Sequence, residues 1–175
     1  MKFREDRARA ANRENEEPEG KQTAACYDAA AELTQSRADW LRGRIRNQSD
    51  SLTGLWIDRF GGTIEIVQEK ERFLFEIEVM RGPTFHTGSL AGVASWNTPL
   101  GWFSDKGRDK EKTEESNRVF VERGSVVEII GANTSYYHGA RAYFDGEYSK
   151  VGELDEKRKA TVIKDAEAGA IADEK

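Results

Sequence analysis

Two histidines and one cysteine are the residues of this 175-residue chain best suited to metal binding or nucleophilic chemistry. His86 and His138 lie far apart in the sequence, and no H-x-x-x-H spacing joins them. They form weak metal candidates, because a metal site needs the fold to bring them together with further ligands such as carboxylates. The alternative is that each histidine forms a hydrogen bond in a turn, and the sequence favours this interpretation.

The cysteine does not have the surroundings of a nucleophile. Cys26 falls on the apolar positions of a helical pattern, which is typical of a small core residue. As the only cysteine in the chain, it cannot form an intramolecular disulfide. Gly61-Gly62 fits a hairpin turn better than a phosphate-binding loop. We therefore predict that the protein is not an enzyme and needs no cofactor.

Aromatic side chains are numerous enough to line the mouth of a small β-barrel. The alternative is that most of them pack in the core or at the barrel rim. If a ligand pocket exists, we expect four aromatic residues to contribute to it: Trp56, Trp96, Trp102 and Tyr143.

Composition narrows the class of protein. Charged residues make up 34% of the chain and are concentrated at its two ends, so the folded core should be shorter than the sequence. The net charge of -5 argues against nucleic acid as a partner. No stretch approaches the roughly 20 apolar residues of a membrane-spanning helix. We expect a single domain with appended segments.

Helical periodicity is confined to residues 23–48, after a charged segment (1–22) that we expect to be disordered or frayed. Within this predicted helix the apolar stripe consists of Cys26, Ala30, Leu33, Trp40 and Leu41. The stripe must be buried, either against the rest of the chain or against a second copy, so a homo-oligomer through this helix is one possibility.

Residues 52–150 alternate between apolar and polar side chains in short segments separated by turn residues. This pattern predicts a mainly β protein, with a small antiparallel β-barrel or sandwich of seven to eight strands after the long helix. In its final strand we expect Ala142, Phe144 and Tyr148 to face the core. Residues 105–117 are interpreted as a solvated loop. Residues 151–175 are interpreted as a charged tail, or at most a loosely docked helix.

Two segments resemble motifs of a bacterial family. GPTFHTGSLAGVA (82–94) is similar to a turn and strand of the form G-P-x-x-H-T-C followed by G-x-A. YHGARAYFDGEY (137–148) is similar to a closing strand C-G-x-x-A-x-F-D-G-x-Y. Both motifs belong to the β-domain of exported proteins of the lysozyme inhibitor LprI-like family, and Ala25 to Ile45 resembles the helix before that domain.

The resemblance implies a non-enzymatic protein-binding module of the bacterial envelope, periplasmic or secreted. Its partner would be a lysozyme-like or other envelope protein. Gly88 and His138 stand where the family often has cysteines, so the disulfide that the family implies is missing.

A weaker similarity points elsewhere. LTGLW (52–56) followed by GGT (61–63) is similar to the opening of avidins, and GLW alone to the G-x-W of lipocalins. This implies a calycin-like barrel that binds a small molecule, which is the alternative function.

Overall fold

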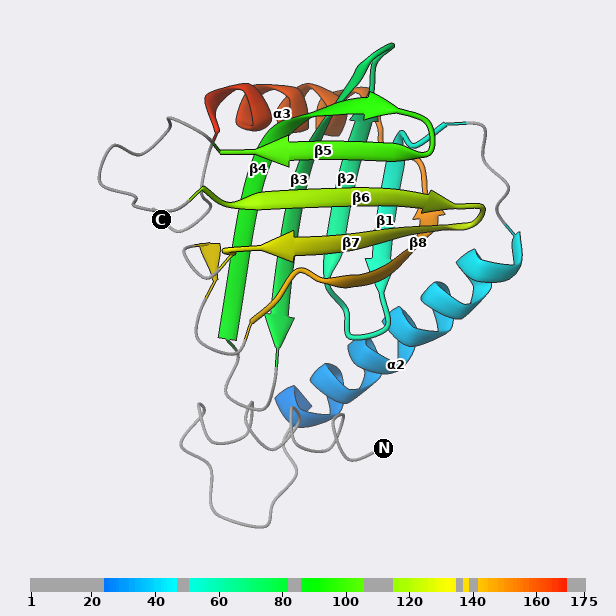
Figure 1. The fold of residues 1–175 in the computed structure, drawn as a ribbon. Coiled ribbons are helices and arrows are strands. Elements are labelled where there is room, and N and C mark those ends of the chain that lie inside the picture. The colour runs from blue at the N-terminus through cyan, green and yellow to red at the C-terminus, as the bar shows by residue number, and fades with distance from the viewer. Residues whose placement is uncertain are drawn as a thin grey trace.

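The computed structural model describes residues 24–46, 51–81, 86–105, 115–134, 137–138 and 142–169. These residues form two helices and eight strands (Figure 1). The helices are α2 (Ala24–Arg46) and α3 (Glu156–Ala168). The strands are β1 (Gly54–Asp58), β2 (Thr63–Gln68), β3 (Arg72–Arg81), β4 (His86–Asn97), β5 (Leu100–Ser104), β6 (Asn117–Arg123), β7 (Val126–Ala132) and β8 (Gly146–Gly152).

The strands form a closed antiparallel barrel in which each strand pairs with its neighbour in sequence and β8 pairs with β1. The predicted mainly β fold with a preceding helix is confirmed. Of the two predicted forms, barrel and sandwich, the structure is a barrel. Closure leaves no unpaired sheet edge, since the last strand satisfies the free backbone groups of the first.

Aromatic rings fill the centre of the barrel. The rings of Phe73 and Phe120 lie 4.9 Å apart, and Phe75 lies 5.2 Å from Phe103 and 5.0 Å from Phe120. Glycine makes room for them: a Cβ at Gly92 would come 2.4 Å from the Phe103 ring. At this level the barrel interior is a close-packed core.

The closing strand has the predicted facing. Ala142, Phe144 and Tyr148 are buried in the core, and the Tyr148 hydroxyl donates to the Phe144 carbonyl at 2.8 Å. Asp145 accepts a hydrogen bond from the Gly131 N–H at 3.0 Å, next to Gly146 with its positive φ of 146°. Regular pairing begins only at Gly146, later than the alternating pattern indicates.

Helix α2 agrees closely with the predicted helix, but its contact face differs from the predicted stripe. Leu33 is buried and Trp40 is half-buried, whereas Leu41 is 47% exposed, so its assignment to the buried stripe is wrong. Gly43 makes the close contact with β8 instead, since a Cβ at this position would lie 2.5 Å from the Lys150 carbonyl oxygen. A glycine in contact lets the helix backbone approach β8 closely.

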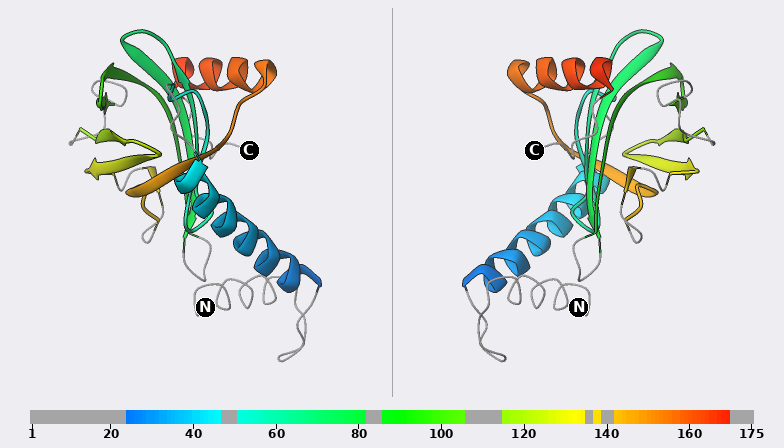
Figure 2. Two further views of the ribbon diagram at one scale, coloured as in Figure 1. Left: turned by 90° about the vertical axis from the view of Figure 1, so that its right-hand side faces the viewer. Right: turned by 90° about the vertical axis from the view of Figure 1, so that its left-hand side faces the viewer.

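In Figure 2 the C-terminal half of α2 lies against the barrel and its N-terminal half extends away. Neither described helix is long and apolar enough to cross a membrane. Three predictions concern residues whose placement is not described: the frayed segment 1–22, most of the charged loop 105–117 and the side chain of Cys26.

Of the two interpretations of residues 151–175, a charged tail or a docked helix, the structure has the helix in the central part, where α3 packs on the barrel. Asp155 caps the helix by accepting from the Arg158 N–H at 2.7 Å, and Val162 packs against Val67 and Leu154. Arg158 also forms ion pairs with carboxylates of β2 and β3. The charges that suggested a solvated tail are therefore partly used in docking.

Candidate functional site

The structure places the four aromatic candidates in different environments. Trp56 and Trp96 are buried in the core, and the Trp56 indole donates to the Leu52 carbonyl at 2.9 Å. Trp102 and Tyr143 are 51% and 43% exposed. The four side chains do not line one site, and only the last two are open to a partner.

The two histidines lie near one end of β4. His86 begins that strand, and His138 forms an isolated antiparallel bridge with Gly88. The His138 Nε2 lies 3.0 Å from the Thr134 hydroxyl, and its ring meets the edge of Phe144 at 5.5 Å. Within the part of the chain that the structure describes, no three His, Cys, Asp or Glu residues are grouped so as to hold a metal ion.

The turn between β1 and β2 forms one wall of a pocket. Gly61 has a positive φ of 85°, which confirms the Gly61-Gly62 hairpin turn. The Asp58 carboxylate accepts from the N–H groups of Phe60 at 2.9 Å and Gly62 at 2.7 Å. An aspartate that bonds the backbone two residues on is an Asx turn, and it fixes the backbone from which the Phe60 ring projects.

Arg81, at the end of β3, joins this turn to the segment before β8. Its Nη2 donates to Asp58 Oδ2 at 2.5 Å, and its Nε donates to the Tyr143 carbonyl at 3.2 Å. The guanidinium lies 5.5 Å from the centre of the Phe60 ring and 5.0 Å from that of Tyr143. The buried cation thus holds two aromatic rings of the pocket in place through ion pairing and cation–π contact.

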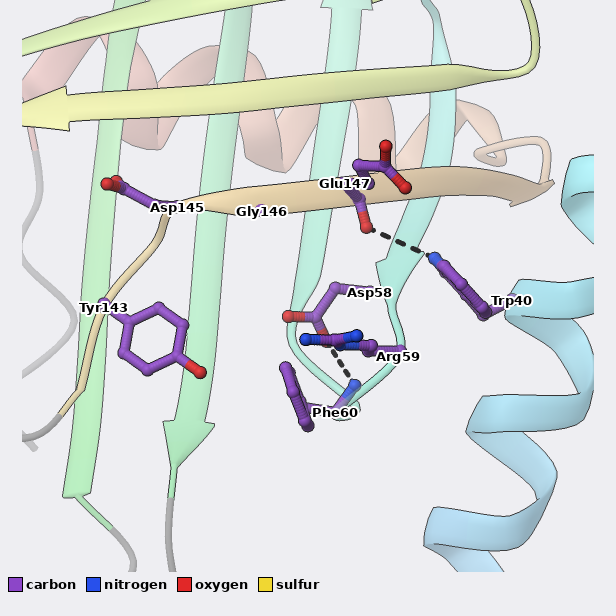
Figure 3. Close-up of a pocket in the computed structure, with 8 residues that line it drawn as sticks. All are labelled: Trp40, Asp58, Arg59, Phe60, Tyr143, Asp145, Gly146 and Glu147. Atoms are coloured by element: carbon purple, nitrogen blue, oxygen red, sulfur yellow. Dashed lines mark hydrogen bonds between the residues drawn. The ribbon is translucent and has the colours of Figure 1, made fainter.

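Beside these two rings lies a pocket of about 260 Å³ between α2, the β1–β2 turn and the start of β8 (Figure 3). We call it the helix–barrel pocket. Its lining residues are Trp40, Asp58, Arg59, Phe60, Tyr143, Asp145, Gly146 and Glu147. Trp40 closes the helix side and donates through Nε1 to the Glu147 carbonyl at 3.2 Å.

Some charged side chains of the helix–barrel pocket form ion pairs, and others lie against aromatic rings. Arg44 of α2 forms an ion pair with Glu147, and the exposed Arg59 lies with its guanidinium 4.6 Å from the centre of the Phe60 ring. Surrounding protein atoms desolvate the Asp145 carboxyl and raise its pKa, which the Gly131 hydrogen bond and the charge of Arg118 offset only in part. The pocket therefore combines aromatic surface with an acidic group that is partly desolvated.

A second exposed feature is the outer surface of β5, β6 and β7, which we call the β5–β7 face. Leu100, Trp102 and Ile130 are 52%, 51% and 48% exposed there. Strand register places Trp102 opposite Val119, and Val119 opposite Ile130, so the three side chains form one row across three strands. Leu100 extends the row on β5.

One buried cation inside the barrel has incomplete hydrogen bonding. Arg118 of β6 lies inside between the rings of Phe144, at 5.0 Å, and Tyr137, at 5.8 Å. Its Nε and Nη2 have no hydrogen-bond partner among the described residues, and burial lowers its pKa to about 10. Arg118 does not line the helix–barrel pocket.

Sequence reasoning missed most of the pocket. An aspartate before a Gly-Gly pair is a readable Asx-turn signal at Asp58. No local signal pairs Asp58 with Arg81, since the two meet only through the register of β1, β2 and β3. No family model, curated protein sequence or solved structure significantly matches the chain, so the geometry of these residues carries the functional argument.

Proposed function

We propose that this protein is a non-enzymatic binding module of the bacterial envelope, exported from the cytoplasm, that binds a basic, lysozyme-like protein. The observation that carries the proposal is the row of exposed apolar side chains on the β5–β7 face, in which Trp102 lies between Leu100 and Val119.

The β5–β7 face has the composition of a protein interface. Large aromatic and aliphatic side chains that are exposed together mark contact surfaces, and tryptophan is enriched among the residues that dominate binding energy. On the opposite side of the barrel, α3 covers the outward apolar residues of β2 and β3, including Val67 (Figure 2). The β5–β7 face has no such cover from the described elements.

Charge supports a basic partner. The chain carries a net charge of -5. Glu128 lies opposite Val121 on the β5–β7 face and opposite Glu147 on β8. Each of these carboxylates forms an ion pair, Glu128 with Arg123 and Glu147 with Arg44, so the border of the apolar row carries both signs of charge. The support for a basic partner therefore comes from the net charge of the chain, which favours the approach of a protein of opposite charge.

The family resemblance supports the envelope assignment. Gly88 and His138, which occupy the positions where the family often has cysteines, lie directly opposite each other in the structure. A Cβ at Gly88 would lie 2.6 Å from the His138 Cβ. Two motif positions that are distant in sequence therefore meet in space, with their Cβ positions closer than the roughly 3.5–4.5 Å that a disulfide needs.

The small-molecule alternative gains no support from the barrel interior. The calycin-like function needs space between the strands, and the rings of Phe73, Phe75, Phe103 and Phe120 occupy the described interior in mutual contact. A ligand there would have to displace packed side chains.

Calorimetric titration with a c-type lysozyme, together with an assay of its activity, tests the proposal. We expect micromolar or tighter binding, and a loss of about tenfold or more in affinity for a Trp102→Ser/Ile130→Thr variant. Leu41→Ser is the matched control, since Leu41 is similarly exposed but lies on α2. Absence of binding at micromolar concentration, or an equal loss in the control, contradicts the proposal.

A further inference from the structure

We propose that the helix–barrel pocket is a subsite for one cationic side chain of the protein partner, an arginine or lysine that enters between Phe60, Tyr143 and Asp145. This inference deepens the proposed function and rests on it for the identity of the partner as a protein.

The pocket has the size of a side chain. At about 260 Å³ it is smaller than the roughly 300–1,000 Å³ of pockets for drug-sized ligands. In Figure 3 the Tyr143 ring faces Phe60 and Arg59 across the pocket, with Gly146 above and Asp145 at the upper edge, its carboxylate turned to the side away from Phe60. A single long side chain can enter such a space while its backbone remains on the surface.

The walls suit a cation that has an apolar stem. Aromatic rings attract a guanidinium or ammonium group, and their edges pack against the methylene groups. Asp145 Oδ1 accepts the Gly131 N–H, and no hydrogen bond from the described residues reaches Oδ2. That oxygen can form a charge-assisted bond with an incoming cation.

The molecule already holds a guanidinium in this place. Arg59, at the rim of the pocket, lies over Phe60 at 4.6 Å and forms no ion pair with another described residue. Because Arg59 is exposed and on a turn, its side chain can leave at small cost. Arg59 therefore acts as an internal stand-in for the arginine of a partner and competes with it.

The pocket also adjoins the surface proposed for the partner. Glu147 lines the pocket and lies opposite Glu128, which borders the β5–β7 face. A protein seated on that face can place one basic side chain in the pocket without a second binding region. The two features thus form one continuous interface.

Nuclear magnetic resonance titration with acetyl-arginine amide tests the subsite, read from the Trp40 indole N–H and the Gly146 amide. Acetyl-citrulline amide is the control, because it has nearly the same shape and no charge. We expect the arginine probe to shift both signals and the citrulline probe to leave them unchanged. Equal shifts with the two probes, or none with either, overturn the inference.

Two variants should change the affinity for the arginine probe in opposite directions. Asp145→Asn keeps the acceptor for Gly131 and removes the charge, so affinity for the arginine probe should fall about fivefold, as for a solvent-exposed charge pair near 4 Å. Arg59→Gln removes the competitor, so affinity should rise. Unchanged affinity in both variants, or the reverse signs, contradicts a cation subsite.

The proposed cation subsite and the proposed protein partner can be contradicted independently of each other. Binding of the arginine probe without binding of lysozyme supports the pocket and overturns the partner assignment. Binding of lysozyme that depends on Trp102, without binding of the probe, overturns the pocket and leaves the β5–β7 face as the interface.

Discussion

Asp58 and Arg81 form a buried ion pair that ties the β1–β2 turn to the end of β3, with 2.5 Å between Oδ2 and Nη2. The same guanidinium donates to the Tyr143 carbonyl, so one cation connects three segments at the wall of the helix–barrel pocket. Both side chains are almost fully buried, which makes each dependent on the charge of the other.

Asp58→Asn should destabilise the protein by about 3 kcal/mol or more, because it leaves the Arg81 charge buried without its counter-ion. Asparagine retains an acceptor for the turn N–H groups, so the loss reports mainly on charge. Urea unfolding measures the effect. Glu69→Gln, in the exposed pair with Arg72, should cost less than about 1 kcal/mol, and equal losses would contradict the buried pair's role.

Gly43→Ala should weaken the docking of α2 on β8. Alanine in a helix interior normally stabilises it by about 1 kcal/mol relative to glycine, whereas a Cβ here would lie 2.5 Å from the Lys150 carbonyl oxygen. The sign of the stability change therefore separates the two effects. We expect a lower unfolding midpoint and faster hydrogen exchange of the Trp40 indole N–H. A higher midpoint would show that the helix does not contact β8 through Gly43.

A Gly88→Cys/His138→Cys variant should form a disulfide under mild oxidation, best tested in a Cys26→Ser background. Opposed residues of an antiparallel bridge have Cα separations of about 4.5–5.5 Å, within the range that a disulfide spans. A Cβ at Gly88 would lie 2.6 Å from the His138 Cβ, so the two segments must separate by about 1 Å to form the bond. The oxidised form should be more stable than the reduced form by about 2–4 kcal/mol.

Thiol titration and unfolding of both forms measure the result of that double substitution. Each single-cysteine variant serves as its control. Persistent free thiols in the folded double variant would contradict the bridge between β4 and His138.

Glu76→Gln should change how stability depends on pH. Desolvation beneath α3 raises the pKa of the Glu76 carboxyl above its ordinary 4.5, although Arg158 offsets part of the rise. The folded state therefore binds this proton more tightly than the unfolded state does. The stability contributed by the protonated group is present below about pH 4.5 and is lost as pH rises through the raised pKa.

Urea midpoints of the wild type and Glu76→Gln between pH 4 and 7 test this dependence. The stability of the wild type relative to the variant should fall as pH rises above about 4.5. Glu71→Gln, on an exposed residue of the preceding turn, is the control. A constant difference between wild type and Glu76→Gln across this range would contradict the burial of Glu76 under α3.

Local periodicity determined the elements of this protein. Alternation placed Ala142, Phe144 and Tyr148 on the inner face, because successive strand side chains point to opposite sides. Local residue types likewise assigned Gly61-Gly62 to a turn. Each of these inferences needs only neighbours in the sequence.

Tertiary structure decided which surfaces remain exposed. The charged sequence of α3 suggests a solvated tail, but in the structure Arg158 forms ion pairs with Glu65 and Glu76. The helical pattern suggests that Leu41 contacts the barrel, but in the structure Gly43 makes the close contact with β8. The helix–barrel pocket depends on Asp58 and Arg81 meeting across three strands. Such contacts follow from strand register and barrel closure, which no local pattern of residue types specifies.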